Sequence, residues 1–360
     1  MRIALLGDIA LIGRYDRLKA DDVDLRIQCI KDIVQNCDYV IANLESPLTQ
    51  IKKTLMCKGV YLRSDPINVT SLQKMGVTHV TLANNHIFDY GKLGAVDTIR
   101  TLKNAGIKFV GLGNKPELLQ VGDSRALLDG FCCLSANGVH YGLSRGKTKI
   151  LTPDSLEMFL KKANLKNCLP IASIHYGLEG VHYPSVEHVC LFRNMAEKYN
   201  YILHGNHPHA IQGYEKYNDS LLVYAQGNLC FDETPVTSIH SVPKETEEER
   251  KCYITIVEVV HRNIKDYKTY TIRDSKESGL VEDRLIAEEL KEYKTVLGKS
   301  LEELKRKRGE ELDAQRRNAE ERTVRFYINR LNYKYVGAYL NGRLHARKYK
   351  KIIKKYDETE

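Results

Sequence analysis

Short hydrophobic runs alternate with segments of helical periodicity through roughly the first 210 residues of the chain. Apolar runs that end at turn residues predict buried strands. Segments whose apolar residues recur three and four positions apart predict helices between these strands. The predicted strands cover 2–8, 39–45, 77–86, 108–113, 125–136, 170–177 and 201–209, and the predicted helices cover 22–36, 67–76, 92–106, 153–164 and 185–200.

Three further strands follow one another without helices between them, at 221–228, 251–260 and 267–273. Strand–helix alternation that passes into a run of strands favours an α/β fold with two packed sheets over a simple doubly wound sheet. The charge run at 244–251 is expected to form a solvated loop. A change of composition near 277–283 predicts a core domain, 1–275, and a helical, basic C-terminal extension, 276–360, that is rich in strong helix formers.

Charge is unevenly distributed along the chain. The 55 Lys and Arg residues exceed the 46 Asp and Glu residues, which gives a net charge of +9. Residues 281–360 hold 21 basic and 15 acidic side chains, and residues 322–356 hold 11 Lys and Arg without any acid. The composition, 42% hydrophobic and 28% charged, excludes wholesale disorder, collagen and coiled-coil proteins.

The sequence favours a cytoplasmic location. No apolar run approaches the roughly 18 residues of a membrane-spanning helix. The N-terminus lacks a small-residue cleavage site and meets Asp8 after a short apolar run, so a strand is expected there and not a signal peptide. Nine cysteines without a C-x-x-C pair suit a reducing compartment. Peripheral contact with the inner face of the membrane is compatible with this location.

Five polar motifs lie directly after predicted strands. A single polar residue at a strand end is common, whereas five motifs that together supply carboxylate, amide and imidazole groups are hard to explain as turns. Because α/β sheets bind ligands beyond the carboxyl ends of their strands, these motifs are expected to share one site. They are Gly7-Asp8, Asn43-Leu44-Glu45, Asn84-Asn85-His86 with Asp89, His175-x-Gly177-x-Glu179 and Gly205-Asn206-His207-Pro208-His209.

The donor atoms of these motifs suit a metal centre. Carboxylate, amide oxygen and imidazole together favour Zn, Mn or Fe(II), and no thiolate is needed. Glu45 could bridge two ions, and a turn at Pro208 could direct His207 and His209 toward both. Asp89 lies three residues after His86 and could orient that imidazole as a general acid.

Structural roles compete with this interpretation at single positions. Asp8 could cap a turn, and Asn84 and Asn85 could be turn residues. Three histidines lie near the motifs in sequence. A structural role is favoured for them, and a role in supporting the site stays open: His182, His188 and His204. His79 is expected to be a side chain on a strand face, and four histidines that lie away from the motifs are expected to be surface or core residues: His140, His240, His261 and His345.

The motifs occur in the order GD, NLE, ANNHIFDYG, HYGLEG, HGNHPHAIQGYEKY and VYAQGNLCFD. Over roughly residues 2–235 this order resembles the bacterial capsule and poly-γ-glutamate synthesis family of CapA type, a branch of the calcineurin-like metallophosphoesterases. The resemblance implies a four-layer α/β/β/α sandwich and a site for two divalent metal ions, Mn, Zn or Fe.

The resemblance also implies three roles for the matching residues. Six would hold the metals: Asp8 and His209 the first, Asn85, His175 and His207 the second, and Glu45 both. His86, assisted by Asp89, would protonate a leaving oxygen. Four would lie in the pocket wall or at its mouth: Glu179, Asn84, Gly227 and Asn228.

Two positions depart from the family pattern. Ala10 stands where the superfamily has a histidine, so one metal is expected to be weakly held. Asn206 replaces the first histidine of the GHHPH motif and is not expected to be a ligand. Some relatives carry a membrane anchor that this sequence lacks, which leaves poly-γ-glutamate open as the partner or product.

Segment 322–356 mixes basic residues with tyrosines. It could be a helical arm that packs on the core, it could contact an anionic membrane surface or a synthase, or it could bind a polyanion. Nucleic acid is the least supported partner because no reader motif accompanies the charge.

The leading functional hypothesis is metal-dependent hydrolysis of a phosphoester in cell-surface polymer synthesis. The expected substrate is a phosphorylated small molecule or an anionic polymer precursor. Two alternatives stay open: a non-catalytic scaffold of a synthesis complex, and a metal-dependent hydrolase or transferase acting on a γ-glutamyl-type amide.

Overall fold

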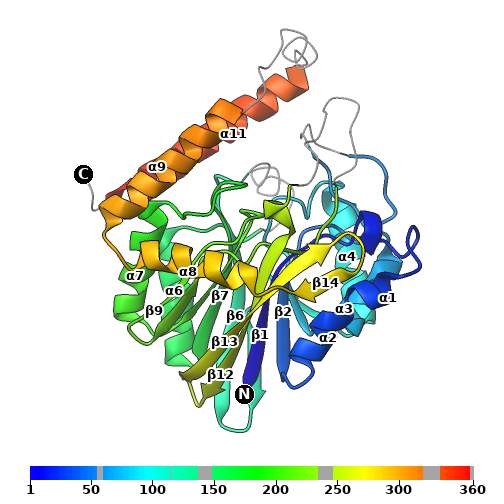
Figure 1. Cartoon of the computed structure of the whole chain (residues 1–360), viewed down its shortest axis with the longest axis horizontal. Coiled ribbons are helices and arrows are strands. Elements are labelled where there is room, and N and C mark those ends of the chain that lie inside the picture. Colours follow the sequence, from blue (N-terminus) through cyan, green and yellow to red (C-terminus); the bar gives the residue numbers. More distant parts are fainter. Residues whose placement is uncertain (55–59, 114, 137–147, 234–245, 319–332, 357–360) are drawn as a thin grey trace.

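A computed structural model describes the chain except for residues 55–59, 114, 137–147, 234–245, 319–332 and 357–360 (Figure 1). The described strands form two sheets. Their bounds are β1 Arg2–Ile9, β2 Tyr39–Leu44, β3 His79–Thr81, β4 Lys108–Val110, β5 Glu117–Val121, β6 Ser124–Cys132, β7 Leu169–His175, β8 Ile202–Asn206, β9 Tyr214–Tyr217, β10 Ser220–Val223, β11 Asn228–Cys230, β12 Lys251–Val260, β13 Asn263–Ser275 and β14 Gly279–Glu282.

The first sheet has the strand order β14-β13-β12-β1-β2-β3-β4, and β11 also pairs with β1. Strands β1 to β4 run parallel, whereas β12, β13 and β14 continue the sheet in antiparallel fashion. The second sheet has the order β5-β6-β7-β8-β10-β9 with a parallel centre. In both sheets the parallel strands carry the motifs at their carboxyl ends.

Nine helices are described. Their bounds are α1 Val23–Arg26, α2 Gln28–Val34, α3 Val69–Lys74, α4 Gly91–Asn104, α6 Pro153–Leu165, α7 Val186–Lys198, α8 Leu285–Leu297, α9 Leu301–Asn318 and α11 Tyr333–Ile353. Short 3-10 helices lie at Gly13–Tyr15, Pro66–Asn68, Glu248–Arg250 and Lys354–Tyr356. None of the described helices is both long and apolar enough to cross a membrane.

Three apolar layers separate four layers of secondary structure. In β1, Ile3 and Leu5 face the second sheet, whereas Ala4 and Leu6 face the layer of α2, α3 and α4, because side chains alternate across a strand. In β7, Ile171 belongs to the layer between the sheets and Ile174 to the layer that covers α6 and α7. The central strands of each sheet, such as β1 and β7, are therefore buried on both faces, which explains their continuous apolar runs. The predicted α/β/β/α sandwich is confirmed.

Local details differ from the sequence-based expectations. The helix expected at 22–36 is interrupted at Ile27, and the third strand ends at Thr81, so that the Asn84-Asn85-His86 motif lies on a turn. Residues 244 and 245 of the charge run lie outside the described residues, and residues 246–251 are solvated only in part. Arg250 and Lys251 are buried at its end, where Arg250 bonds to Asp274 O and Lys251 pairs with Glu248 and Glu289.

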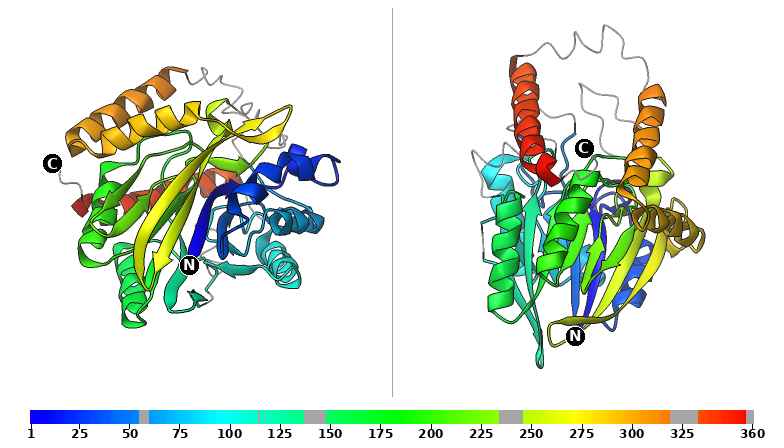
Figure 2. Two further views of the ribbon diagram at one scale, coloured as in Figure 1. Left: turned by 60° about the horizontal axis from the view of Figure 1, so that its bottom comes forward. Right: turned by 90° about the vertical axis from the view of Figure 1, so that its left-hand side faces the viewer.

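The described elements beyond residue 275 pack on the sandwich. Strand β14 pairs with β13, and α8 contacts β9 and β13. Leu304 of α9 and both Tyr349 and Ile353 of α11 join the apolar layer around α7. Figure 2 shows α9 and α11 rising from the end of the sandwich opposite the N-terminus. The division of the chain at residue 275 stays a prediction.

Candidate metal centre

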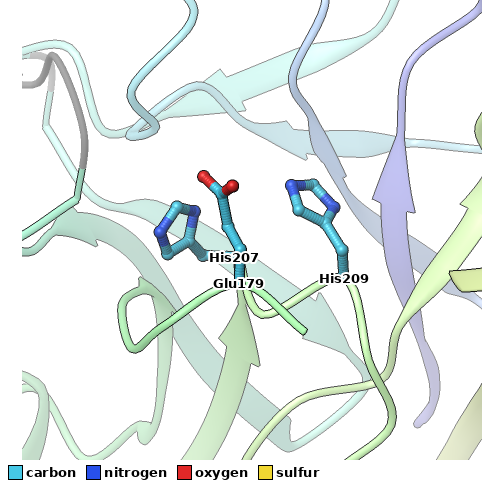
Figure 3. Close-up of side chains that lie close together, drawn as sticks. All are labelled: Glu179, His207 and His209. Atoms are coloured by element: carbon cyan, nitrogen blue, oxygen red, sulfur yellow. The ribbon is translucent and has the colours of Figure 1, made fainter. Parts of the chain in front are cut away.

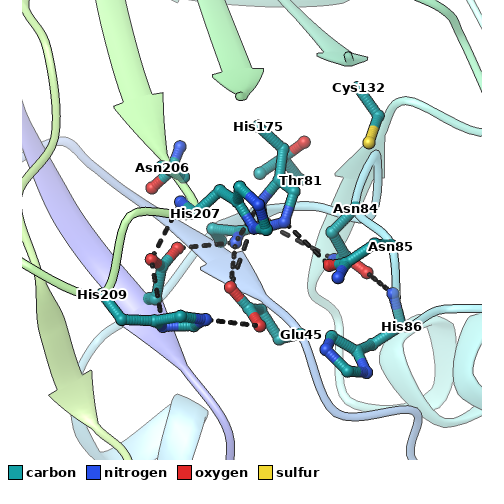
Figure 4. Close-up of polar contacts among 12 residues, drawn as sticks. Glu45, Thr81, Asn84, Asn85, His86, Cys132, His175, Asn206, His207 and His209 are labelled. Atoms are coloured by element: carbon teal, nitrogen blue, oxygen red, sulfur yellow. Dashed lines mark hydrogen bonds and ion pairs between the residues drawn. The ribbon is translucent and has the colours of Figure 1, made fainter. Parts of the chain in front are cut away.

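The motif residues from both sheets meet at one end of the sandwich (Figure 4). Asp8 lies near the end of β1 and Glu45 directly follows β2, while His175 ends β7 and His207 follows β8. The parallel strands of the two packed sheets end on the same side, so side chains that are far apart in sequence converge there. Asp8, Glu45, His175 and His207 are all buried, at 0–3% exposure.

The first group of possible ligands consists of Asp8, Glu45 and His209, whose donor atoms lie within 4.8 Å of one another. His209 Nδ1 is 3.8 Å from Asp8 Oδ2, and His209 Nε2 is 3.8 Å from Glu45 Oε2. His209 Nδ1 also lies 2.8 Å from the side-chain oxygen of Asn228, which orients the ring. Asn228, predicted at the mouth of the site, thus supports a predicted ligand.

The second group consists of Glu179, His207 and His209, again with donor atoms within 4.8 Å (Figure 3). Glu179 comes from the loop after β7 and the two histidines come from the turn after β8. The sequence placed Glu179 in the pocket wall; the structure brings its carboxylate within ligand distance of both imidazoles. His209 belongs to both groups.

His175 connects the two sheets through side-chain contacts. Its Nε2 lies 2.9 Å from Asn85 Oδ1, and its Nδ1 lies 3.9 Å from Glu45 Oε1. The rings of His175 and His207 are 4.5 Å apart. Two donors that bind one ion at about 2.1 Å lie about 3 Å apart at a right angle, so the spacing of His175 and Asn85 is compatible with a shared ion.

Asn43 is a residue of the site that the sequence reasoning did not assign. Its Nδ2 lies 2.7 Å from Asp8 Oδ1, 3.3 Å from Glu45 Oε1 and 3.2 Å from His175 Nδ1. Asn43 precedes Glu45 by two positions, and residues two apart in an extended segment share a face. That spacing could have identified Asn43 from the sequence.

The turn that carries His207 and His209 has an unusual backbone. His207 has φ 99° and His209 has φ 54°, a region that residues other than glycine rarely adopt. The backbone N–H of His207 donates to Asp8 Oδ2 over 3.0 Å. Such conformations persist where the surrounding structure holds them, and they cluster at functional sites. The turn aims both rings at the carboxylates.

Gly7 and Gly227 allow two backbones to approach beside Asp8. The N–H of Asp8 donates to Gly227 O over 2.9 Å. A Cβ atom on Gly7 would lie 2.2 Å from that same oxygen, and Gly227 has φ 77° with its Cβ position 2.3 Å from Lys251 O. Gly227, predicted at the mouth of the site, therefore acts through the backbone.

Burial shapes the electrostatics of the centre. Burial raises the pKa of Asp8, against the opposing charge of His209, and raises the pKa of Glu45 well above its usual range. Burial also disfavours the charged form of His209, but the carboxylates of Glu45, Asp8 and Glu179 outweigh it and raise the pKa of His209 to about 9. Two buried carboxyl groups and one charged imidazole are thus held side by side.

This donor set fits divalent metal ions. Glu45 Oε2 is buried and receives no hydrogen bond from the described residues. A buried, unbonded carboxylate oxygen is costly unless a cation offsets it. The acidic and imidazole donors around Glu45 are those that Zn, Mn and Fe(II) accept.

His86 and Asp89 form a pair beside the centre. His86 Nδ1 lies 2.7 Å from Asp89 Oδ2, and that oxygen also accepts the N–H of Leu62 over 2.9 Å. Because a carboxylate can only accept, Nδ1 carries the hydrogen and Nε2 is the atom that can exchange a proton. Asn84 Oδ1 accepts the N–H groups of His86 and Ile87, so Asn84 shapes the turn.

The two departures from the family pattern have different surroundings. Ala10 is fully buried in a small apolar cluster with Ile12, Leu62 and Phe231. Asn206 Nδ2 donates to His204 O and to Ser173 Oγ, which belong to β8 and β7.

The three other histidines near the motifs make structural contacts. His204 bonds to Leu6 O and thereby joins the two sheets. His188 bonds to Ser185 and Tyr349, and His182 contacts Glu311.

Comparisons with known proteins agree with this arrangement of motifs. The sequence model of the family described as "Bacterial capsule synthesis protein PGA_cap" matches residues 2–233. The capsule biosynthesis protein CapA of Bacillus anthracis is 27% identical over 248 residues, which cover 65% of this chain and 60% of that protein. The PGA biosynthesis protein CapA of Bacillus subtilis is 28% identical over 243 residues, which cover 64% and 63%.

A third relative is the "probable polyglutamine synthesis accessory protein" of Mycobacterium tuberculosis, 24% identical over 256 residues that cover 66% of this chain and 67% of that protein. Among solved structures, the sulfate thiohydrolase SoxB of Thermus thermophilus aligns with a TM-score of 0.41 at 10% identity, over 76% of this chain and 46% of that chain.

The chain spans 60–63% of the length of the two Bacillus relatives. The family match, in contrast, covers well over half of this chain, from β1 through all the strand-end motifs. The chain therefore belongs to the PGA_cap family of bacterial capsule synthesis proteins, within the metallophosphoesterase-like superfamily.

Proposed function

We propose that this protein is a metal-dependent hydrolase of phosphoesters that acts in the synthesis of a bacterial capsule or a related cell-surface polymer. One observation carries the proposal: two groups of ligand atoms, Asp8–Glu45–His209 and Glu179–His207–His209, share His209 and each lie within 4.8 Å. Two adjacent divalent ions are the arrangement that phosphatases and nucleases use.

The chain's own residues divide the work. Asp8, Glu45 and His209 would hold one ion. Asn85, His175 and His207 would hold the other, and Glu179, which lies beside His207, would add a carboxylate to it. Divalent ions in such a site supply a hydroxide nucleophile near neutral pH and neutralise charge on the phosphoryl group. Asn43 and Asn228 orient the donors, and Asn85 positions His175.

His86 is the proposed general acid. Asp89 holds its ring through Nδ1 and leaves Nε2 to deliver a proton to the departing oxygen.

The names of the relatives support the biological setting. Two are named for capsule or PGA biosynthesis and one for polyglutamine synthesis. These names also favour a second candidate, in which the same centre acts on a γ-glutamyl-type amide, because metal-activated water can attack a carbonyl carbon as well as phosphorus. A non-catalytic assembly role is the third candidate.

A substrate panel separates these candidates. Purified protein would be stripped of metal, loaded with Mn²⁺ and offered bis(p-nitrophenyl) phosphate, p-nitrophenyl phosphate and a γ-glutamyl anilide. We expect turnover of a phosphate ester that chelation abolishes, and a loss of at least about 10²-fold in Asp8→Asn, which removes a ligand charge.

The matched control is Asp21→Asn, an exposed carboxylate that belongs to neither ligand group, which should retain full activity. Turnover of the anilide alone would favour the amide candidate, and no turnover of any substrate by metal-loaded protein would favour the assembly role.

An anionic partner for the basic C-terminal segment is also proposed, either a membrane surface or a polymer precursor. In the described part of that segment, one face of α11 carries the exposed residues Leu340, Arg343, Leu344, Arg347 and Lys351. Loss of binding to anionic vesicles in Arg347→Glu/Lys351→Glu would support a membrane surface, and unchanged binding would contradict it.

A further inference from the structure

The loop at residues 177–184 joins β7 to α7 and carries Glu179 to the metal centre. The side chain of Glu179 is exposed, whereas those of Asp8 and Glu45 are enclosed by packing. The loop also contains two glycines in the left-handed region, Gly177 with φ 103° and Gly180 with φ 69°. The position of the Glu179 carboxylate therefore depends on the loop backbone as well as on the contacts of its own side chain.

One face of α9 holds this backbone. Arg308, Glu311 and Gln315 follow Leu304 at spacings of four, three and four residues, which places all four on one side of a helix. Leu304 anchors that side in the apolar layer around α7.

Each of the three polar residues reaches the loop. Arg308 donates to the carbonyl oxygen of Tyr183, and Gln315 donates to the carbonyl oxygen of Gly180. Glu311 accepts the backbone N–H of His182 over 2.9 Å and lies 2.6 Å from His182 Nδ1.

The contact between His182 and Glu311 lies in the middle of this set of contacts between α9 and the loop. Their side chains are only 14% and 17% exposed. The His182 ring stacks on Tyr293 of α8, with 5.1 Å between ring centroids, and its Nε2 lies 3.2 Å from Glu248 Oε2. Hydrogen bonds between charged groups, such as that between His182 and Glu311, are shorter and stronger than those between neutral groups.

The 177–184 loop is also hydrogen-bonded to the segment that carries His207 and His209. The N–H of Gly180 donates to Pro208 O over 2.7 Å, and Gln212 Nε2 donates to Val181 O over 2.7 Å. A shift of the loop would therefore change the position of Glu179 relative to both imidazoles of its ligand group.

We propose that α9 is a positioning element of the metal centre, in which Arg308, Glu311 and Gln315 hold the 177–184 loop so that Glu179 faces His207 and His209. The inference rests on the proposed function, because it concerns the binding of metal. The family match ends at residue 233, so this support comes from a part of the chain outside the matched region.

The test compares two neighbouring carboxylates of α9 that point in different directions, Glu311 toward His182 and Glu310 toward Arg306. Glu311→Gln removes the charge that faces His182, whereas Glu310→Gln removes one that pairs with Arg306 on the outer face. Mn²⁺ affinity of the metal-stripped full chain would be measured by calorimetry, with hydrogen exchange of residues 177–184 and thermal unfolding alongside. We expect Glu311→Gln to weaken the affinity roughly 10-fold, the lower end for residues that orient ligands, and to speed exchange in the loop. Glu310→Gln should match the wild type.

A double-variant cycle separates positioning from general destabilisation. If α9 acts through Glu179, Glu311→Gln should have no further effect on Mn²⁺ affinity in a Glu179→Gln background. Additive losses would overturn the inference, as would a Glu311→Gln protein that binds Mn²⁺ like the wild type while Glu179→Gln binds it more weakly. Wild-type protein that binds no Mn²⁺ would instead overturn the proposed function and this inference with it. If Glu311→Gln does not fold, Gln315→Ala, an exposed position, should show a smaller loss of affinity, and unchanged affinity there would count against the inference.

Discussion

Asn43 contacts three of the proposed metal ligands through one amide nitrogen. It lies 2.7 Å from Asp8, 3.3 Å from Glu45 and 3.2 Å from His175. An amide nitrogen has two hydrogens, so three acceptors must share them. Asn43 thus gathers the donors, and Asn228 orients His209 in a similar way. Substitution of a residue that orients a metal ligand typically lowers metal affinity about 10–100-fold.

The His86–Asp89 pair leads to a prediction at the level of single residues. A general acid matters most when the leaving oxygen is a poor leaving group. In the proposed hydrolase, His86→Gln should therefore lower kcat about 10²-fold or more for an alkyl phosphodiester, but far less for a p-nitrophenyl ester, whose phenolate leaves without a proton. Steady-state kinetics on the two substrates measure the difference.

Mn²⁺ affinity is the control for this variant, because His86 belongs to neither ligand group. It should stay at the wild-type value. An equal loss of kcat on both substrates would contradict the role of His86 as an acid.

At the level of elements, the strand ends supply most of the proposed ligands, and the C-terminal helices contact one loop. Residues 2–9 and 39–44 form β1 and β2 as their apolar runs predict, and the polar residues after them reach the centre. The Asn84-Asn85-His86 motif instead lies on a turn, since β3 stops at Thr81. No local pattern in the sequence of α9 indicates which loop it contacts, because that contact joins residues about 130 positions apart.

The His182 contacts predict how this region responds to pH. Burial disfavours the charged imidazole, but Glu248 and Glu311 outweigh it and raise the pKa of His182 from 6.5 to about 9. A raised histidine pKa stabilises the folded state fully below about pH 6.5, and this contribution is lost as the pH rises through about 9. The expected loss is about 1–3 kcal/mol.

Urea unfolding of the wild type and of His182→Gln at pH 7 and pH 10 measures this loss. The difference in unfolding free energy between the two proteins should shrink at the higher pH, because other groups that titrate affect both proteins alike. A difference that is constant with pH would show that the ion pairs of His182 do not stabilise the fold.

At the level of the whole molecule, the centre exists only where the two sheets pack. Asp8 and Glu45 come from the first sheet, His175 and His207 come from the second, and His204 ties the two together through Leu6 O. The unfolded chain cannot reproduce this set of donors, so metal binding should stabilise the folded state.

Removal of metal should therefore lower Tm. A ligand at 100 times its Kd adds about 2.7 kcal/mol to the stability of a protein that binds it only when folded. We expect Mn²⁺ to raise Tm of the stripped protein by a few degrees, as thermal unfolding would measure. Asp8→Asn should lose most of this rise and Asp21→Asn should keep it. An unchanged Tm in the wild type would argue against a native metal centre.

The sequence by itself determined the sandwich and most of the candidate donors, because burial on both faces of a sheet leaves continuous apolar runs and each motif directly follows such a run. Only the tertiary structure decided which donors meet. It brought Glu179 to His207 and His209, and it set Arg308, Glu311 and Gln315 against the 177–184 loop. The physical reason is that local periodicity reports which face of an element is buried, whereas contacts between side chains far apart in the chain depend on how whole elements pack.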